Sequence, residues 1–425
     1  MNVLVVGSGG REHALAWKIS KSPRLSKLYC APGNGGTRLV AENIAISDAD
    51  VRALADFAAR ERIDLTVVGP EVPLSLGLVD EFEKRGLRVF GPTRTAAELE
   101  GSKVYAKQFM DRHAIPTGRF KVAESADEAL AVLRSAEFCL PVVVKADGLA
   151  AGKGVIICKT TGEAELAICA IMVEKQFGEA GRRVLIEEFL RGKEVSFIVV
   201  SDGARALPFV TTMDHKAVFD GDEGPNTGGM GTISPSPFLS DALFDEVMRT
   251  IIGPTIVRMA EDGRPYKGAL YAGLMLTAEG PKVLEYNCRF GDPETQPQML
   301  RLSSDLVDLL LAAVEGDIGT QKVHWSEDAA ACVILASGGY PGAYEKGKII
   351  EGLEEAARLP GVEIFHAGTK YENGRYLTSG GRVLGVCGTG PTLAAARAKI
   401  YGAVGLIRFD GLHYRRDIGT ARMDA

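Results

Sequence analysis

The chain has 425 residues, of which 46% are hydrophobic and 24% are charged, values typical of a soluble globular protein with roughly two to four domains. A formal net charge of −6 argues against nucleic acid as the main partner. The seven cysteines form no CxxC pair, which fits reduced thiols rather than a disulfide framework or a zinc site. No apolar run is long enough for a membrane span and no cleavage pattern precedes the first strand, so we expect a cytoplasmic protein.

The first hundred residues alternate short apolar strands with helices, a pattern that predicts an open parallel α/β sheet. Strands are predicted over residues 2–6, 27–31, 65–68 and 88–90, and helices over 14–18 and 51–60. Because ligands of such sheets bind beyond the carboxyl ends of the strands, we expect one crevice lined by the glycine-bearing strand ends at 7–10, 33–36 and 69–71.

The first of these strand ends, Gly7-Ser8-Gly9-Gly10, resembles part of a dinucleotide-binding fingerprint. That fingerprint requires an acid at the end of the second strand, where this chain has Cys30-Ala31-Pro32-Gly33-Asn34. The absence of the acid disfavours an NAD-dependent oxidoreductase. We instead expect a monophosphate site formed by Arg11 and the free N–H groups of the following helix.

Residues 102–326 are richer in strands and predict an α+β region with hairpins. Ser102 is expected to cap a helix that runs to about Arg112. Further helices are predicted over 126–135, 162–175, 241–260 and 303–314. Strands are predicted over 141–145, 155–158, 183–187, 195–201, 206–212, 269–276 and 282–287.

The last segment begins with a predicted strand at 329–336 and ends with a predicted helix at 392–407, which indicates a small third α/β unit. The expected fold class is therefore a multidomain α/β and α+β protein. Its predicted domains are residues 1–101, 102–326 and 327–425.

Lys145 ends a valine-rich strand and leads into a loop rich in glycine and alanine that contains Gly152, Lys153 and Gly154. Small residues let backbone N–H groups approach phosphate oxygens closely, so the loop is a candidate phosphate cover. It lacks the GxxxxGK[ST] spacing of a P-loop. The alternative is a flexible hairpin in which Lys145 is a solvated strand end.

The run from Glu285 to Arg289 follows the predicted strand residues 281–284. Side chains two apart share a face of a strand, so Glu285, Asn287 and Arg289 should point the same way. An acid and an amide offer oxygen ligands for Mg²⁺, and a neighbouring cation suits a phosphate in transfer. The alternative is a surface strand with mixed polar residues.

Weaker signals lie between these motifs. The strand end at Glu187 to Leu190 could read an adenine edge and Glu194 could bind ribose, although acids at strand ends are usually just solvated. The glycine-rich segment 225–231, preceded by Asp214, is a mobile lid, a small-substrate pocket or only a connection. No serine or cysteine stands in a nucleophile motif such as GxSxG.

These motifs occur in the order that is typical of the ATP-grasp superfamily, and longer runs resemble one of its families, the phosphoribosylamine–glycine ligases. The runs are 5–18, 31–34, 68–71, 145–155, 214–216, 224–231, 287–296, 366–370 and 380–384. The resemblance implies that glycine, 5-phosphoribosylamine and ATP give glycinamide ribonucleotide, ADP and phosphate in purine biosynthesis. Glycyl phosphate would be the intermediate, so no enzyme nucleophile is needed.

The resemblance also assigns roles to residues. Contacts to ATP are implied for Lys103, Lys145, Gly152, Lys153, Gly154, Glu187, Phe189, Leu190 and Glu194. Glu285 and Asn287 would hold Mg²⁺ or Mn²⁺. Arg289 would face the transferred phosphoryl group or the glycine carboxylate, and Asp214 the glycine ammonium. Phosphoribosylamine would be bound by Gly9, Gly10, Arg11, Asn34 and Glu71, with the carboxyl-terminal unit closing that site.

Many superfamily members carry a further acid on the strand before the metal ligands, and residues 271–276 contain none, which leaves the coordination of a second metal open. Another ATP-grasp carboxylate–amine ligase, a biotin-carboxylase-like enzyme and a nucleotide-binding regulatory protein are the alternatives. We expect a monomer that acts on small molecules, without nucleic-acid or membrane partners.

Overall fold

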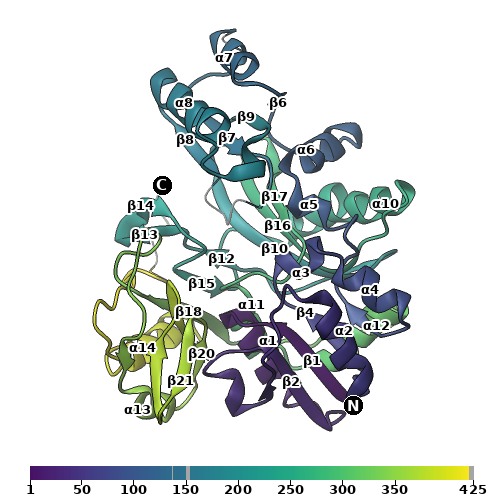
Figure 1. The fold of residues 1–425 in the computed structure, drawn as a ribbon. Coiled ribbons are helices and arrows are strands. Elements are labelled where there is room, and N and C mark those ends of the chain that lie inside the picture. Colours follow the sequence, from purple (N-terminus) through teal and green to yellow (C-terminus); the bar gives the residue numbers. More distant parts are fainter. Residues whose placement is uncertain (136, 150–153, 421–425) are drawn as a thin grey trace.

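The computed structural model of the chain describes residues 1–135, 137–149 and 154–420. In Figure 1 the amino-terminal and carboxyl-terminal units lie side by side at the bottom. The top is formed by β6 (Phe120–Ala123), β7 (Val142–Ala146), β8 (Val155–Cys158) and β9 (Val184–Glu188) with the helices α7 (Ala126–Arg134) and α8 (Thr161–Ile168). The mixed helix and strand content and the separate sheets confirm the predicted multidomain fold class.

The amino-terminal unit is a parallel sheet in the order β3-β2-β1-β4-β5. Its strands are β1 (Asn2–Gly7), β2 (Lys27–Pro32), β3 (Glu42–Asn43), β4 (Leu65–Val68) and β5 (Val89–Phe90). Its helices are α1 (Gly10–Ile19), the 3₁₀ turn η1 (Thr37–Leu39), α2 (Val51–Arg60), α3 (Glu71–Ser75), α4 (Leu78–Lys84) and α5 (Glu98–Gly101). Val3 and Leu4 have no exposed surface because β1 is covered on both faces, which explains its unbroken apolar run.

The central region contains two antiparallel sheets, β6-β9-β7-β8 and β11-β10-β16-β17. The first comprises β6 (Phe120–Ala123), β7 (Val142–Ala146), β8 (Val155–Cys158) and β9 (Val184–Glu188). The second comprises β10 (Lys193–Asp202), β11 (Ala206–Pro208), β16 (Lys267–Thr277) and β17 (Gly280–Asn287). The helices are α6 (Lys103–Arg112), α7 (Ala126–Arg134), α8 (Thr161–Ile168), α9 (Asp241–Val247), α10 (Gly253–Glu261), α11 (Thr295–Arg301) and α12 (Leu306–Glu315).

The predicted start of α6 is confirmed, because the Ser102 hydroxyl accepts a hydrogen bond from the Tyr105 N–H at 3.0 Å. The helix predicted over 162–175 ends in a π-helical segment, η3 (Cys169–Val173). The helix predicted over 241–260 contains a π-helical interruption, the second such segment, η6 (Met248–Ile252). Pro254 follows the second interruption and lacks the N–H that would continue the α-helical ladder. The strand predicted over 206–212 ends at Pro208 for a related reason.

The carboxyl-terminal sheet has the order β12-β15-β18-β23-β20. Its strands are β12 (Met213–Asp214), β15 (Gly231–Ser234), β18 (Ala329–Ala336), β20 (Val362–His366) and β23 (Arg382–Gly390). Helices α13 (Leu353–Ala357) and α14 (Leu393–Val404) belong to this unit, as does a small sheet of β19 (Ile349–Ile350), β21 (Thr369–Glu372) and β22 (Arg375–Thr378). Between β12 and β15 lies a hairpin of β13 (Ala217–Phe219) and β14 (Glu223–Asn226).

Two strands of this sheet, β12 and β15, come from the segment before residue 327, and β15 pairs directly with β18. Helix α11 packs between α1 of the amino-terminal unit and the strands β18 and β23. The central segment therefore contributes to the carboxyl-terminal core, and the predicted boundary between 326 and 327 stays a prediction.

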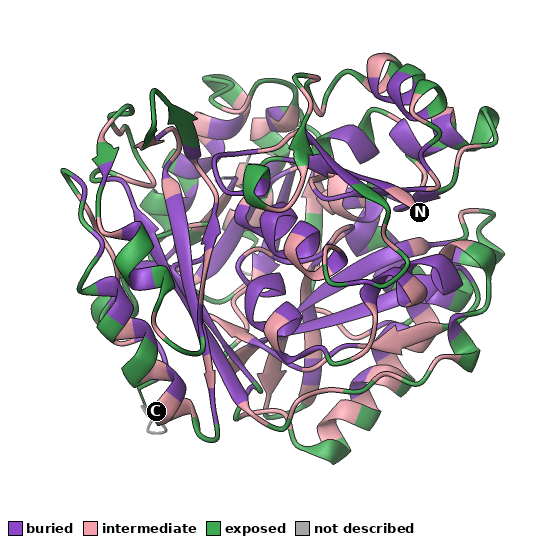
Figure 2. Cartoon of the chain, turned by 90° about the horizontal axis from the view of Figure 1, so that it is seen from below, coloured by how far each residue is buried: buried purple, intermediate pink, exposed green. Residues whose placement is uncertain are grey.

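Burial follows the same organisation. Figure 2 shows long strands that are buried along most of their length and peripheral helices with exposed outer sides. Among the described residues, no helix combines the length and apolar character that crossing a bilayer requires.

Candidate active site

The end of β17 presents the predicted polar triad on one face. Tyr286 and Cys288 are at most 2% exposed and pack into the core. The alternating side chains of Glu285, Asn287 and Arg289 point the other way, and an Arg289 N–H donates to Asn287 Oδ1 at 2.9 Å. Strand alternation therefore brings the two predicted metal ligands and the predicted phosphoryl-facing cation together.

Glu285 lies within a group of basic side chains. The Lys216 Nζ atom is 3.8 Å from Glu285 Oε1, and it also pairs with Glu194 of β10. Burial raises the pKa of Glu285, but the charges of Lys216, Lys103 and Lys145 outweigh burial and hold its pKa below the usual value. Glu285 is therefore an anion in a positively charged setting that suits a polyphosphate.

A second ion cluster lies at the ends of β7 and β9. Glu187 is 4% exposed and accepts from Lys145 at 3.0 Å and from Lys107 at 2.9 Å. Burial lowers the pKa of Lys107 to about 8, although the Glu187 charge opposes the change. Glu187 Oε1 is buried and has no hydrogen-bond partner in the described part of the chain, which leaves an acceptor for a ligand N–H.

Sequence reasoning missed Lys107. It stands one helical turn after Lys103 on α6, so the spacing of four residues could have indicated it. Lys103 itself donates to the Gly148 carbonyl at 2.6 Å, at the root of the candidate phosphate loop. Gly154 O accepts from the Ala146 N–H at 2.8 Å on the far side of that loop. Gly152 and Lys153 lie outside the described residues.

The remaining nucleotide candidates lie near these clusters. Phe189 and Leu190 follow β9 and are half-buried, and Glu194 follows them in β10. Opposite Glu285 in the ladder stands Gly273 of β16, so no acid of that strand faces the predicted metal ligand.

Asp214 at the end of β12 is half-buried, and the charge of the buried Glu294 acts on it. Burial, followed by the Glu294 charge, raises the pKa of Asp214 well above its usual value, and burial also raises the pKa of Glu294. Ser196 donates to Glu294 Oε1 at 2.9 Å. Glu294 lies in the run from 287 to 296 that was recognised as a motif, but no role was predicted for it.

The glycine-rich segment 225–231 is held from the carboxyl-terminal unit. The Gly228 N–H donates to the Tyr340 hydroxyl at 3.0 Å, and Arg382 donates to the Gly228 carbonyl at 2.5 Å and to the Asp292 carbonyl at 2.6 Å. Neither Arg382 nor Asp292 was predicted. Both lie in runs that resemble the ligase family, but the contact of Arg382 with Asp292 and with Gly228 is visible only in the folded structure.

The amino-terminal glycines lie against the same region. A Cβ on Gly9 would stand 3.2 Å from Asp292, and one on Gly10 would stand 2.8 Å from Gln296. The Gly9 N–H donates to Glu12 Oε2 at 2.5 Å, so Glu12 caps α1 and occupies a donor that we expected to be free. Arg11 donates to the Phe290 carbonyl at 3.0 Å.

Asn34 links the amino-terminal and carboxyl-terminal units. Its amide nitrogen donates to the Ser8 carbonyl at 2.9 Å and to the His366 carbonyl at 2.8 Å. The His366 N–H in turn donates to His13 Nδ1 at 2.8 Å. The predicted substrate-binding residue is therefore buried in a junction between units, where it shapes the glycine loop.

Glu71 and Arg289 join the two halves of the candidate site. Arg289 Nε is 3.4 Å from Glu71 Oε2, and Arg289 also lies 3.2 Å from Glu100 Oε1. The Phe290 carbonyl accepts from both Arg289 and Arg11. The predicted amine-binding and phosphoryl-binding residues therefore contact one another.

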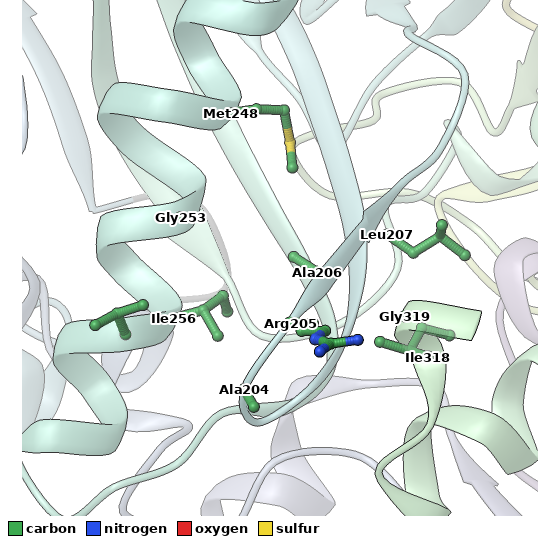
Figure 3. A pocket seen from close by; sticks show the side chains of 10 residues that line it. Ala204, Arg205, Ala206, Leu207, Met248, Gly253, Ile256, Ile318 and Gly319 are labelled. Carbon is green, nitrogen blue, oxygen red and sulfur yellow. The ribbon is translucent and has the colours of Figure 1, made fainter. Parts of the chain in front are cut away.

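A separate cavity of about 390 Å³ lies elsewhere, between the β10–β11 turn, η6 and the 3₁₀ turn η7 (Ile318–Thr320). Figure 3 shows its mainly apolar lining, with Arg205 as the charged group. None of the predicted site residues that the structure describes lines it. The convergence of polar groups at Glu285 is the better basis for a functional site.

The donor set near Glu285 fits a divalent cation. Within the described ranges, no three His, Cys, Asp or Glu side chains gather as a metal cluster. Glu285 and Asn287 supply two oxygen donors, and Mg²⁺ is commonly held by one or two protein groups together with phosphates and water.

The chain matches three family models that together cover most of its length. These are the phosphoribosylglycinamide synthetase N domain over residues 1–100, the ATP-grasp (A) domain over 101–295 and the C domain over 330–421. Phosphoribosylamine–glycine ligase of Salmonella typhimurium LT2 is 52% identical over 423 residues, covering 99% of this chain and 98% of that protein. The enzyme of Escherichia coli K12 is also 52% identical, over 425 residues, with the same two coverages.

Solved structures agree in fold. Phosphoribosylamine–glycine ligase of Thermotoga maritima has a TM-score of 0.84 at 36% identity, covering 98% of this chain and 100% of that one. Biotin carboxylase of Campylobacter jejuni has a TM-score of 0.76 at 14% identity, covering 100% and 95%, which shows a shared fold alone. On the strength of its full-length matches, the chain belongs to the phosphoribosylglycinamide synthetase family of ATP-grasp enzymes.

Proposed function

We propose that this chain joins glycine to 5-phosphoribosylamine at the expense of ATP, forming glycinamide ribonucleotide, ADP and phosphate in purine biosynthesis. The full-length similarity to phosphoribosylamine–glycine ligases supports this reaction. One observation carries it further. Glu285 contacts Lys216, and Asn287 of the same strand accepts from Arg289, which also contacts Glu71 of the amino-terminal unit.

The nucleotide lies between the two ion clusters in this proposal. Lys103 and Lys145 neutralise its phosphates, and the loop ending at Gly154 covers them. Glu187, Phe189 and Leu190 line the adenine and Glu194 meets the ribose. The buried Glu187 Oε1 atom, which has no hydrogen-bond partner among the described residues, supports this placement, because an adenine amino group is an N–H donor.

Glu285 and Asn287 would hold a divalent ion, Mg²⁺ or Mn²⁺. Such an ion neutralises charge that develops on the phosphates when it is bound. The lysines near Glu285 keep that side chain ionised and available as an oxygen donor.

The chemistry proceeds without an enzyme nucleophile. The glycine carboxylate attacks the γ-phosphate and ADP leaves, which gives glycyl phosphate. The amine of phosphoribosylamine then attacks the acyl carbon, loses a proton and expels inorganic phosphate. Arg289 stabilises the transferring phosphoryl group, and Asp214 meets the glycine ammonium.

Gly9, Gly10, Arg11, Asn34 and Glu71 form the phosphoribosylamine side. Because Glu12 occupies the Gly9 N–H, that donor is not assigned to the phosphate of phosphoribosylamine. We assign Asn34 to shaping the glycine loop, and Arg11 to supplying positive charge for that phosphate. We further propose that residues 1–101 carry this side, 102–326 carry ATP and glycine, and 327–425 close the site. The protein would act as a monomer in the cytoplasm.

Consumption of radiolabelled glycine by the purified protein tests the proposal. Labelled product should form only when ATP, a divalent metal and phosphoribosylamine are all present, with one phosphate released per product. Phosphate release with another carboxylate or another amine, and none with this pair, would instead indicate a different ATP-grasp ligase.

A further inference from the structure

Glu100, the last residue matched by the N domain model, contacts the two residues that directly follow Asn287, the last residue of β17. Its side chain is 9% exposed. One carboxylate oxygen accepts the Cys288 backbone N–H at 2.6 Å, and the other lies 3.2 Å from an Arg289 guanidinium nitrogen. A single carboxylate therefore holds the backbone and the side chain of consecutive residues.

This double contact restrains the orientation of the Arg289 guanidinium group, which also contacts Asn287. The guanidinium nitrogen that faces Glu100 also donates to Asn287 Oδ1 at 2.9 Å. A charge-assisted, two-point contact fixes the plane of an arginine more firmly than a solvated side chain could. The orientation of Asn287, a proposed metal ligand, depends on the same nitrogen.

The packing around Glu100 fixes its position next to Cys288 and Arg289. Cys288 is fully buried, and its Sγ atom contacts the Ala97 carbonyl at 3.6 Å, so the segment carrying Glu100 packs along the strand end. Burial raises the pKa of Glu100, and the Arg289 charge opposes that rise. The carboxylate and the guanidinium are thus mutually stabilising, and loss of one leaves the other buried and unpaired.

Glu71 contacts Arg289 differently. Its pair with Arg289 Nε is longer, at 3.4 Å, and its side chain is 32% exposed. Glu71 can therefore turn toward a substrate while Glu100 keeps its contacts.

We propose that Glu100 is a positioning residue that holds Arg289 and Asn287 in the geometry needed for phosphoryl transfer. This inference rests on the role that the proposed function gives to Arg289. In this proposal the influence of Glu100 passes through Arg289, and Glu100 is not assigned a contact with substrate.

The test compares Glu100→Gln with Glu98→Gln. Glu98 is on the same helix, but it is 48% exposed and pairs with Arg264 on the surface. In the glycine-dependent assay we expect Glu100→Gln to lower kcat at least tenfold while the KM for ATP changes less than threefold. Glu98→Gln should match the parent chain.

A double variant separates positioning from general damage. If Glu100 acts through Arg289, adding Glu100→Gln to Arg289→Lys should lower kcat no further than Arg289→Lys alone. Full additivity, or a Glu100→Gln variant with the parent's kcat, would overturn the inference. Should Glu100→Gln not fold, Glu100→Asp replaces it, because it keeps the charge but is too short to make both contacts; normal kcat there also overturns the inference.

These outcomes are distinct from failure of the proposed function. If Arg289→Lys alone retains the parent's activity, the assigned role of Arg289 is wrong. If Arg289→Lys is impaired and Glu100→Gln is normal, only the positioning role of Glu100 is wrong.

Discussion

Arg289 Nε lies 3.4 Å from Glu71 Oε2, so the segment directly after β17 and the first residue of α3 meet in one ion pair. The two residues are far apart in the chain and belong to different family-model domains. Under the proposed reaction, Arg289 serves the phosphoryl group and Glu71 the attacking amine. Under that proposal, their contact would place the two reacting groups next to each other, as an acyl phosphate protected from water requires.

Replacing Glu285 with alanine should lower kcat by about a hundredfold or more, because it removes a proposed metal ligand. The melting temperature should stay close to that of the parent chain, while stabilisation by ATP with Mg²⁺ should disappear. Glu279→Ala is the matched control, since Glu279 is 77% exposed at the turn of the same hairpin. A near-normal kcat in Glu285→Ala would contradict the metal assignment.

Replacing Arg11 with alanine should raise the KM for phosphoribosylamine about tenfold, a loss of about 1.4 kcal/mol of binding, and leave the KM for ATP within about twofold. The expected reason is the loss of positive charge next to the amino-terminal glycine loop. Initial rates with each substrate varied in turn measure both constants. Arg38→Ala, which removes an exposed arginine over the Tyr371 ring, is the control. Equal changes in both constants would move Arg11 out of the amine site.

Stability should fall as the pH is lowered through the range in which unfolded histidines gain protons. Burial, followed by the charge of His366, lowers the pKa of His13 to about 3, and burial lowers that of His366 to about 4. Unfolded histidine titrates near 6.5, so between about pH 6.5 and 4 the unfolded chain binds more protons than the folded one. Each histidine then removes about 1.4 kcal/mol of unfolding free energy per pH unit.

His13→Asn tests this expectation, because an amide oxygen can accept the His366 N–H in place of Nδ1. Urea unfolding between pH 7.5 and 4.5 should give a shallower decline for the variant than for the parent chain. Parallel declines would show that His13 does not enter the folded structure in its neutral form.

Gly229→Ala should raise the KM for glycine about tenfold, because the new Cβ would lie 2.4 Å from Pro293 Cδ and 2.7 Å from Asp214 Oδ1. The φ angle of +109° adds backbone strain of about 1–2 kcal/mol. Gly86→Ala separates the two effects, since Gly86 has a φ of +70° and open space around it. If both variants show the same KM for glycine, the contact with Asp214 has no role in binding that substrate.

Local sequence patterns determined much of the fold. The apolar run of β1, the Ser102 cap of α6 and the alternation from Glu285 to Arg289 each depend on neighbours within a few residues. Such patterns depend on local backbone geometry and burial, so the structure that they predict is the one found in the folded protein. The sequence also indicated the family, because the motifs that carry the resemblance are contiguous runs of residues.

Only the tertiary structure showed which residues of distant runs contact one another. Glu100 contacts Cys288 across 188 positions, and Asn34 contacts His366 across 332. Strands β12 and β15 leave the central segment to pair with the carboxyl-terminal sheet. A carboxylate or an amide looks the same in sequence whether it is solvated or buried against a distant partner, and its charge state and role follow from that partner. The sequence thus determined the residue types and the side of a strand on which each side chain lies. The contacts of Glu100, Asn34 and Arg289 form only when the units pack together.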